Sequence, residues 1–287
     1  FESFEKGKVH IFYQHYLPKK KLNKKIYHIV FQHGVIEHQF RHIVLFNYLM
    51  EKLNGQIVIS AMDLAGHGKS GGHRAYISEF DNFSKDWLKF LNICHERFYE
   101  NEEHEVETIV ISHSLGGLVV LNTLTNQEYE LPFNISKLVF SNPCIAPSIE
   151  LPGAIKRAVT KFPMAASKLR LPLIYGAYDL THDSERAIAF IKDPLISKAV
   201  TVKVGIEILK ACDKLVGHSY FFQFKSFFIL SGDDKIVDNS KADIFISGMD
   251  KSLVKVKKYP KMYHDILNET CRIEVFDEII NYIKKNK

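Results

Sequence analysis

Apolar residues occur along the chain in two alternating patterns: short continuous runs, and longer stretches that repeat every three to four residues. A continuous apolar run is typical of a strand that is buried on both faces, as in a parallel sheet. We therefore expect strands at residues 8–16, 26–32, 56–62, 107–112, 136–141, 226–231 and 253–258.

The stretches between these runs have helical periodicity. Phe83, Trp87 and Phe90 fall on one side of a helix over residues 81–99 and can lie on a sheet. Strands that alternate with such helices predict an α/β fold, with a mostly parallel central sheet flanked by helices. The expected helices are residues 41–53, 81–99, 115–126, 239–250 and 271–285.

The alternation stops between residues 145 and 224, where short amphipathic helical patterns are separated by prolines. We interpret this stretch as a helical cap inserted into the α/β core. The predicted core therefore consists of residues 1–144 and 225–287, and the predicted cap of residues 145–224.

Composition and charge narrow the class of protein. Hydrophobic residues make up 46% and charged residues 25% of the chain, as in a globular domain. The net charge of +5 is small, and the lysine runs at residues 19–21 and 24–25 come without a nucleic-acid-binding motif. We expect no nucleic-acid partner.

The four cysteines are widely spaced and form no C-x-x-C pair, so we expect free thiols in a reducing, cytoplasmic compartment. No apolar stretch reaches the ~18 residues of a membrane span. The sequence begins with Phe1 and not with Met, so we expect that a preceding segment has been removed. Nothing in the sequence indicates the oligomeric state.

Ser114 lies where a predicted strand meets a predicted helix, within SHSLGG. Such a sharp turn exposes a serine hydroxyl at a helix N-terminus, which favours the negative charge that develops during acyl transfer. The G-x-S-x-G pattern has glycine two positions before the serine, whereas this chain has Ser112. We expect the turn to accept this hydroxymethyl group, so Ser114 remains the candidate nucleophile.

A serine nucleophile requires a base and an acid that orients the base, and α/β-hydrolases supply them in the order Ser, Asp or Glu, His. Asp233 and Asp234 both follow the predicted strand at residues 226–231, and His264 follows the last predicted strand. The spacing alone leaves the choice between the two aspartates open.

Several motifs in order resemble the monoacylglycerol lipase and lysophospholipase group of α/β-hydrolases, also described as serine aminopeptidase-like hydrolases. They are FQHGVIEH, MDLAGHGKSGGHRAYISEFDNF, SHSLGGLVV, LSGDDKIVD and YPKMYHDILNE, and the resemblance covers residues 8–285.

The resemblance implies roles for individual residues. It places the nucleophile at Ser114, the acid at Asp234 and the base at His264. The two backbone N–H groups of the oxyanion hole fall on Val35 and Leu115. No metal or organic cofactor is implied.

Glu37 and Arg41 have two interpretations. Their i, i+4 spacing is that of a simple helix ion pair. The resemblance instead places them near the polar end of the substrate pocket.

The resemblance also implies a substrate, a single-chain glycerolipid ester, either monoacylglycerol or lysophospholipid. Lys156, Arg157 and Lys161 lie beside apolar residues in the predicted cap. A helix with a basic and an apolar face can contact a membrane, so we expect peripheral contact at its inner face. Alternatives are a general carboxylesterase, a peptidase of the same fold and a catalytically silent binding protein.

Two other motifs are weaker. GHGKSG at residues 66–71 fits the G-x-G-x-x-G pattern of dinucleotide-binding proteins, but no helical pattern begins there. His38 and His42 are spaced like a metal pair, but H-E-x-x-H is not complete. We expect neither a nucleotide site nor a metal site.

Overall fold

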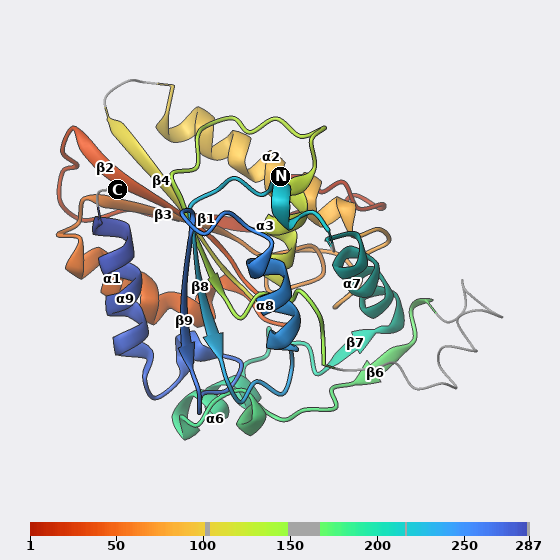
Figure 1. The fold of residues 1–287 in the computed structure, drawn as a ribbon. Coiled ribbons are helices and arrows are strands. Elements are labelled where there is room, and N and C mark those ends of the chain that lie inside the picture. The colour runs from red at the N-terminus through yellow and green to blue at the C-terminus, as the bar shows by residue number, and fades with distance from the viewer. Residues whose placement is uncertain (101–103, 149–166, 216, 286–287) are drawn as a thin grey trace.

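The computed structural model describes residues 1–100, 104–148, 167–215 and 217–285. Its central sheet has seven strands in the order β1-β3-β2-β4-β5-β8-β9 (Figure 1). β1 pairs antiparallel with β3, and the other neighbours are parallel, as expected. The strands are β1 (Tyr13–Tyr16), β2 (Lys25–Gln32), β3 (Ile57–Met62), β4 (Glu105–His113), β5 (Lys137–Ser141), β8 (Ser226–Ser231) and β9 (Val254–Tyr259).

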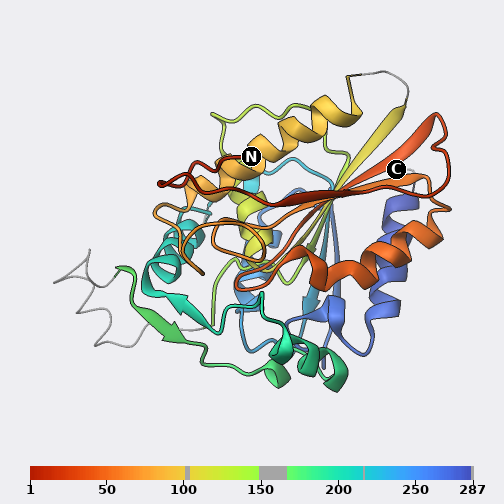
Figure 2. The ribbon, with the colours of Figure 1, turned by 180° about the vertical axis from the view of Figure 1, so that it is seen from behind.

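Helices cover both faces of this sheet (Figures 1 and 2). One face carries α1 (Ile43–Lys52) and α9 (Arg272–Lys284). The opposite face carries α2 (Asp81–Phe98), α3 (Leu115–Thr125), α7 (Val202–Leu215) and α8 (Asn239–Ser247).

The two covered faces explain the continuous apolar runs. In β4, Ile109 and Ile111 belong to the core beneath α1 and α9, whereas Val110 belongs to the core beneath α2 and α3. Successive side chains of a strand point to opposite faces, so a strand covered on both sides is apolar at most positions and shows no alternation. The α/β fold class is confirmed.

Some predicted boundaries differ from the structure. The first strand is expected at residues 8–16, but only Tyr13–Tyr16 pairs with β3 as a strand. The helix expected at residues 41–53 begins instead as a 3₁₀ helix at Gln39–His42, which leads into α1.

The stretch between β5 and β8, residues 145–224, which we call the inserted segment after its predicted role, contains strands that the sequence pattern does not predict. β6 (Arg170–Pro172) and β7 (Ala199–Thr201) form a two-stranded antiparallel sheet, and α6 (Ser184–Lys192) lies between them. α7 shares one apolar core with α2 and α3. The predicted basic cap helix falls on residues 149–166, outside the described residues, and the division into core and cap stays a prediction.

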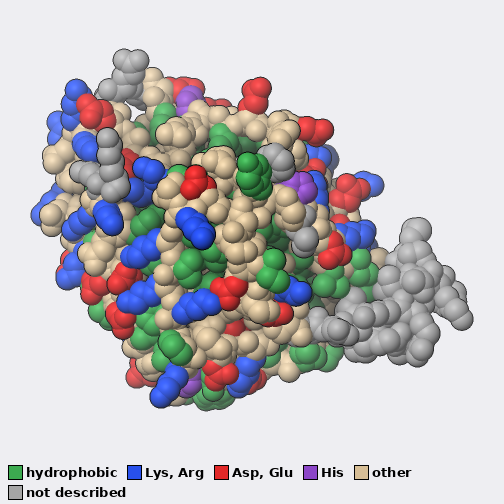
Figure 3. Space-filling view, in the orientation of Figure 1, with side chains coloured by type: hydrophobic (Ala, Val, Ile, Leu, Met, Phe, Trp, Pro, Cys, Tyr) green, Lys and Arg blue, Asp and Glu red, His purple; other side chains and the backbone are tan. Residues whose placement is uncertain are grey.

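On the face drawn in Figure 3, Lys and Arg side chains are interspersed with Asp and Glu and do not gather into one basic patch.

β9 is an edge strand rich in lysine. The lysines of β9 are paired with carboxylates: Lys255 with Glu278, Lys257 with Glu274 and Glu278, and Lys258 with Asp243.

The four cysteines are free thiols, as expected, and all but Cys271 are buried. Among the described helices, none is both long and apolar enough to cross a membrane.

Candidate active site

Ser114 occupies the sharp turn between β4 and α3. Its backbone angles are φ 50° and ψ −119°, a strained conformation for a residue with a side chain. Backbone hydrogen bonds to the turn after β5 hold it: the Ser114 N–H donates to the carbonyl of Ser141, and the Cys144 N–H donates to the carbonyl of Ser114, both at 3.0 Å. The strain is therefore held in place by neighbouring backbone.

The two residues that flank this turn have different amounts of space. A Cβ atom added to Gly116 would lie 2.4 Å from the carbonyl oxygen of Gln32, which is too close for any side chain. Ser112 is fully buried, and its hydroxyl lies 3.5 Å from the carbonyl oxygen of Val139. The departure from G-x-S-x-G at position 112 is thus accommodated.

Ser114, His264 and Asp234 form a hydrogen-bonded chain. The Oγ of Ser114 lies 2.9 Å from His264 Nε2, and His264 Nδ1 lies 2.7 Å from Asp234 Oδ2. The other oxygen of Asp234 accepts the N–H groups of Ile236 and Val237 at 2.8 and 3.0 Å. The structure therefore brings Asp234 to His264, whereas Asp233, the alternative acid, is exposed.

The charges of His264 and Asp234 suit proton transfer from Ser114. Burial opposes the charge of His264, but the adjacent Asp234 outweighs it, so the pKa of His264 lies above the usual 6.5. Burial also disfavours the charge of Asp234. The pKa of Asp234 nevertheless lies below its usual value, because His264 and two backbone N–H groups stabilise the carboxylate.

Two hydrogen bonds of the His33 ring hold the loop that carries Val35. His33 Nε2 accepts the Leu64 N–H at 2.9 Å, so the proton is on Nδ1, which donates to the Gly34 carbonyl at 2.7 Å. The described peptide bonds, including the one between Gly34 and Val35, are trans, and the N–H of a trans peptide points opposite to its carbonyl. Holding the Gly34 carbonyl therefore also fixes the direction of the Val35 N–H.

Leu115 is the first residue of α3. The N–H groups of a first helical turn have no partner within the helix, so they can bind an anion. Val35 and Ser114 both line the cavity described below. The oxyanion roles of Val35 and Leu115 stay predictions.

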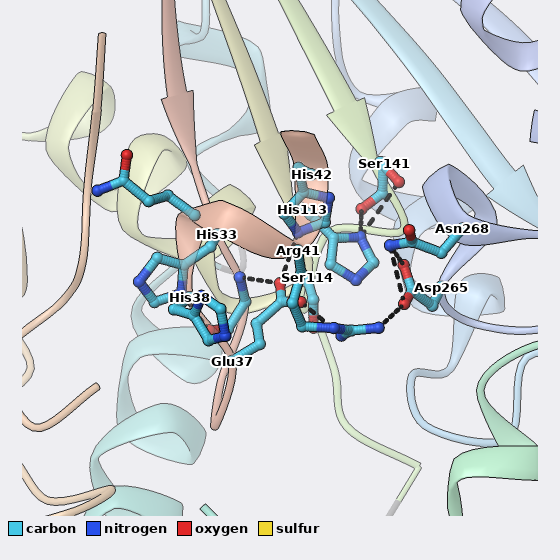
Figure 4. A network of polar contacts seen from close by, with 12 residues as sticks. His33, Glu37, His38, Arg41, His42, His113, Ser114, Ser141, Asp265 and Asn268 are labelled. Carbon is cyan, nitrogen blue, oxygen red and sulfur yellow. Dashed lines mark hydrogen bonds and ion pairs between the residues drawn. The ribbon is translucent and has the colours of Figure 1, made fainter. Parts of the chain in front are cut away.

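Glu37 and Arg41 meet in a buried polar cluster next to Ser114 (Figure 4). Arg41 binds Glu37 Oε2 at 2.8 Å through Nη1 and Asp265 Oδ2 at 2.6 Å through Nη2. Glu37 Oε1 also accepts the Gly34 N–H at 2.6 Å and lies 3.2 Å from His42 Nε2. We call these residues the Arg41 cluster: Glu37, Arg41, His42, Asp265 and Asn268, whose amide donates to Asp265.

The charges of this cluster stabilise one another. Burial alone would raise the pKa of Glu37, but His42 and Arg41 lower it well below its usual value. The pKa of Asp265 is likewise lowered against burial, mainly by Arg41. Arg41 therefore lies between two ionised carboxylates.

Sequence reasoning missed Asp265, His42 and His113 as members of this site. His113 precedes the nucleophile, and its ring centre lies 5.0 Å from that of His264. Asp265 follows the candidate base directly, and this adjacency is the one sequence signal that could have identified it. Burial lowers the pKa of His113 to about 4, so its ring is neutral at pH 7.

A small cavity of about 20 Å³ lies beside Ser114. Its polar wall includes Glu37, Arg41 and Asp265. Its apolar wall includes Ile236 from the core and, from the inserted segment, Tyr175, Leu180 and Phe190. The site is therefore polar on one side and apolar on the other.

The inserted segment is hydrogen-bonded to the loops of the site. The Ser197 N–H donates to the carbonyl of Ile36 at 3.0 Å, and the Asp265 N–H donates to the carbonyl of Leu180 at 2.9 Å. His38 Nε2 lies 2.8 Å from Asp193 at the end of α6.

The weaker motifs have structural roles. Residues 64–80, which include GHGKSG, form turns without a helix, and Asp63 accepts the N–H groups of Gln39 and Lys69 there. His38 pairs with Asp193, and His42 with Glu37. Within the described ranges, no three His, Cys, Asp or Glu side chains are grouped so that they could hold a metal ion.

Comparison with known proteins places this architecture among the α/β-hydrolases. The crystal structure of a Paleococcus ferrophilus monoacylglycerol lipase superposes with a TM-score of 0.75 at 20% identity, covering 96% of this chain and 98% of that one. The model of the serine aminopeptidase S33 family matches residues 23–271. The chain belongs to this family of hydrolases.

Three relatives span most of the chain at low identity. The uncharacterized protein YnbC of Escherichia coli is 25% identical over 96% of this chain, but the match spans only 45% of YnbC. Phospholipase YtpA of Bacillus subtilis is 23% identical over 89% of this chain and 94% of its own. Human monoglyceride lipase is 27% identical over 90% of this chain and 82% of its own.

Proposed function

We propose that the protein is a serine ester hydrolase in which Ser114 is the nucleophile, His264 the base and Asp234 the acid. The observation that carries this proposal is the continuous hydrogen-bonded chain from Ser114 Oγ through His264 to Asp234, at 2.9 and 2.7 Å. Asp234 orients His264 so that Nδ1 carries a proton and Nε2 is free to accept one.

The mechanism follows from these positions. His264 Nε2 takes the hydroxyl proton of Ser114 as Oγ attacks the ester carbonyl carbon. The N–H groups of Val35 and Leu115 stabilise the oxyanion of the tetrahedral intermediate. His264 then donates the proton to the departing alcohol, and a water molecule, activated in the same way, releases the acid from Ser114.

The proposed substrate is an ester of a single-chain glycerolipid. Relatives named phospholipase and monoglyceride lipase support this class, as does the cavity with an apolar and a polar side. Each buried CH₂ group contributes about 0.8 kcal/mol, which favours a long chain over an acetyl group. A cavity of about 20 Å³ holds roughly one water molecule, so side chains such as Tyr175 must move to admit that chain.

The Arg41 cluster favours a neutral leaving alcohol. Glu37 and Asp265 contribute two carboxylates next to Ser114, and both terminal nitrogens of Arg41 are already engaged by them. A phosphate group in this place would be repelled by the two carboxylates, which already neutralise the charge of Arg41. We therefore propose monoacylglycerol ahead of lysophospholipid.

Peripheral membrane contact through the inserted segment stays part of the proposal. Leu169 and Ile174 are 50% and 74% exposed, and Lys168 and Arg170 flank Leu169 in the sequence. Exposed apolar residues next to basic ones suit an anionic bilayer surface.

A fluorophosphonate probe tests the proposed nucleophile. The wild-type protein should be labelled, and Ser114→Ala should not be, with turnover lower by about 10⁶-fold. A folded wild-type protein that stays unlabelled would contradict the proposal and favour the catalytically silent alternative.

A substrate panel tests the proposed class. Rates with p-nitrophenyl esters should rise from two-carbon to long acyl chains, and long-chain monoacylglycerol should be cleaved faster than the matching lysophospholipid. A preference for acetate would indicate a general carboxylesterase, and cleavage of peptides alone would indicate a peptidase.

A further inference from the structure

Asn142 lies where the chain leaves the sheet for the inserted segment. It directly follows β5, is fully buried and has φ 42°, in the left-handed region that few residues other than glycine and asparagine adopt. Its N–H donates to the carbonyl of Ile229 at 2.9 Å, which ties the end of β5 to β8. The proposed mechanism assigns this residue no role.

The side chain of Asn142 joins the strand that precedes the acid to the loop that carries the base. Its Oδ1 accepts the Ser231 N–H at 2.7 Å, and Ser231 lies three residues before Asp234. Its Nδ2 donates to Ser231 Oγ at 2.8 Å and to the carbonyl of His264 at 2.6 Å. Because an N–H only donates and a carbonyl only accepts, these partners fix the orientation of the amide.

Ser231 adds a second connection to the same loop. Its hydroxyl donates to the carbonyl of Tyr263 at 2.6 Å. The carbonyls of two successive residues, Tyr263 and His264, are therefore held by one connected pair of side chains.

The turn that contains Asn142 also holds the nucleophile. The Ser141 carbonyl accepts the Ser114 N–H, and the Cys144 N–H donates to the Ser114 carbonyl. Residues 141–144 thus contact the backbone of Ser114 on both sides and, through Asn142, the backbone of His264. One turn sets the relative position of these two residues.

We propose that Asn142 is a positioning residue, which places His264 at the correct distance from Ser114 through its hydrogen bonds to His264 and Ser231. This inference rests on the proposed serine hydrolase function. Only asparagine combines here a tolerated left-handed conformation with two N–H donors and an acceptor. Glycine tolerates the conformation without the side-chain bonds, and aspartate keeps the shape without the donors.

These differences allow the positioning role to be separated from a role in stability. Asn142→Gly, Asn142→Ala and Asn142→Asp each lose the hydrogen bond to the His264 carbonyl. We expect kcat on a p-nitrophenyl ester to fall about ten- to one-hundred-fold in all three, as for a misplacement of about 1 Å, with KM within twofold of wild type. The rate of fluorophosphonate labelling should fall in parallel.

Thermal stability should follow a different order. Glycine relieves the left-handed strain that alanine retains, so Asn142→Gly should melt at a higher temperature than Asn142→Ala although both lose activity equally. The matched control is Asn122→Ala. Asn122 is also buried, but its amide donates to the carbonyls of Leu118 and Ala211. This control should lower the melting temperature and leave kcat within twofold.

Two results would overturn the inference: a folded Asn142→Gly with wild-type kcat, or kcat values in the four variants that simply follow their melting temperatures. Each is distinct from failure of the proposed function, because that failure would appear as an unlabelled wild-type protein.

Discussion

At the scale of single residues, space next to the nucleophile is distributed unevenly. The backbone of Gln32 and His33 closes in on Gly116, where an added Cβ would lie 2.4 and 2.5 Å from the two carbonyl oxygens. Ser112 has a buried side chain in β4 and close contact with β5. Glycine is therefore required at position 116, on the helix side of Ser114, but not at position 112, on the strand side.

This asymmetry predicts opposite outcomes for two small substitutions. Gly116→Ala should push the backbone of Gln32 and His33 aside, which should lower kcat and cost about 1–3 kcal/mol of stability. Ser112→Gly should keep kcat within a few-fold and cost about 0.5–1 kcal/mol. Ester hydrolysis and chemical denaturation measure both effects. Wild-type kcat in Gly116→Ala would refute the steric argument.

The protonation of His264 predicts the pH dependence of activity. Only the neutral ring accepts the proton of Ser114, so kcat/KM should fall as the pH drops through the pKa of His264. Asp234 raises that pKa above 6.5, which places the midpoint of the acid limb above 6.5. Asp234→Asn should move the midpoint to lower pH and reduce kcat by about 10⁴-fold. An unchanged midpoint in this variant would show that another group controls the limb.

At the scale of secondary-structure elements, patterns predict long elements well and short ones poorly. α2 carries a regular apolar stripe that includes Phe83, Trp87 and Phe90, all fully buried, and its predicted bounds differ from the structure by one residue. β6 and β7 have three residues each, too few to establish a period, and depend on each other for pairing. The left-handed conformation of Asn142 likewise has no pattern that would reveal it.

Asp86 of α2 binds the N-terminal segment, and we expect it to make the free energy of unfolding depend on pH. Asp86 accepts the Phe4 N–H and the Ser3 hydroxyl, and burial raises its pKa to about 6. A folded-state pKa above the unfolded value gives stability that is complete below about pH 4 and is lost as the pH rises through 6. The difference in unfolding free energy between wild type and Asp86→Asn should therefore fall from pH 4 to pH 7.

Asp81 on the same helix is the matched control, because its pKa is lowered. Burial raises the pKa of Asp81, but bonds with Tyr129 and Lys85 outweigh burial. Its contribution should be present above pH 4 and lost as the pH falls through its folded-state pKa. Urea denaturation of Asp86→Asn and Asp81→Asn should give opposite slopes against pH, and parallel slopes would contradict both assignments.

At the scale of the whole molecule, the sequence predicts the site better than its surroundings. Ser114 and His264 could be predicted because each follows a predicted strand, and parallel strands end at the same edge of a sheet. The strand pattern also predicts an acid after residues 226–231, but only the resemblance to the family chooses Asp234 over Asp233. The contact between Arg41 and Asp265 could not be predicted, because Asp265 lies 224 residues away and nothing in the local sequence marks the pair. Strand order has the same limit, since the run of β3 does not indicate that it lies between β1 and β2.

The hydrogen bonds between the inserted segment and the loops of the site affect how a ligand would bind. Ser197 and Leu180 are bonded to Ile36 and Asp265, so the wall that they carry is already ordered in the free protein. Ordering a side chain on binding costs about 0.5–1.5 kcal/mol, and this wall avoids much of that entropic cost. A ligand that is admitted by movement of side chains such as Tyr175 alone keeps these bonds and gains affinity from preorganisation. A ligand that displaces the backbone of Leu180 or Ser197 must first break them.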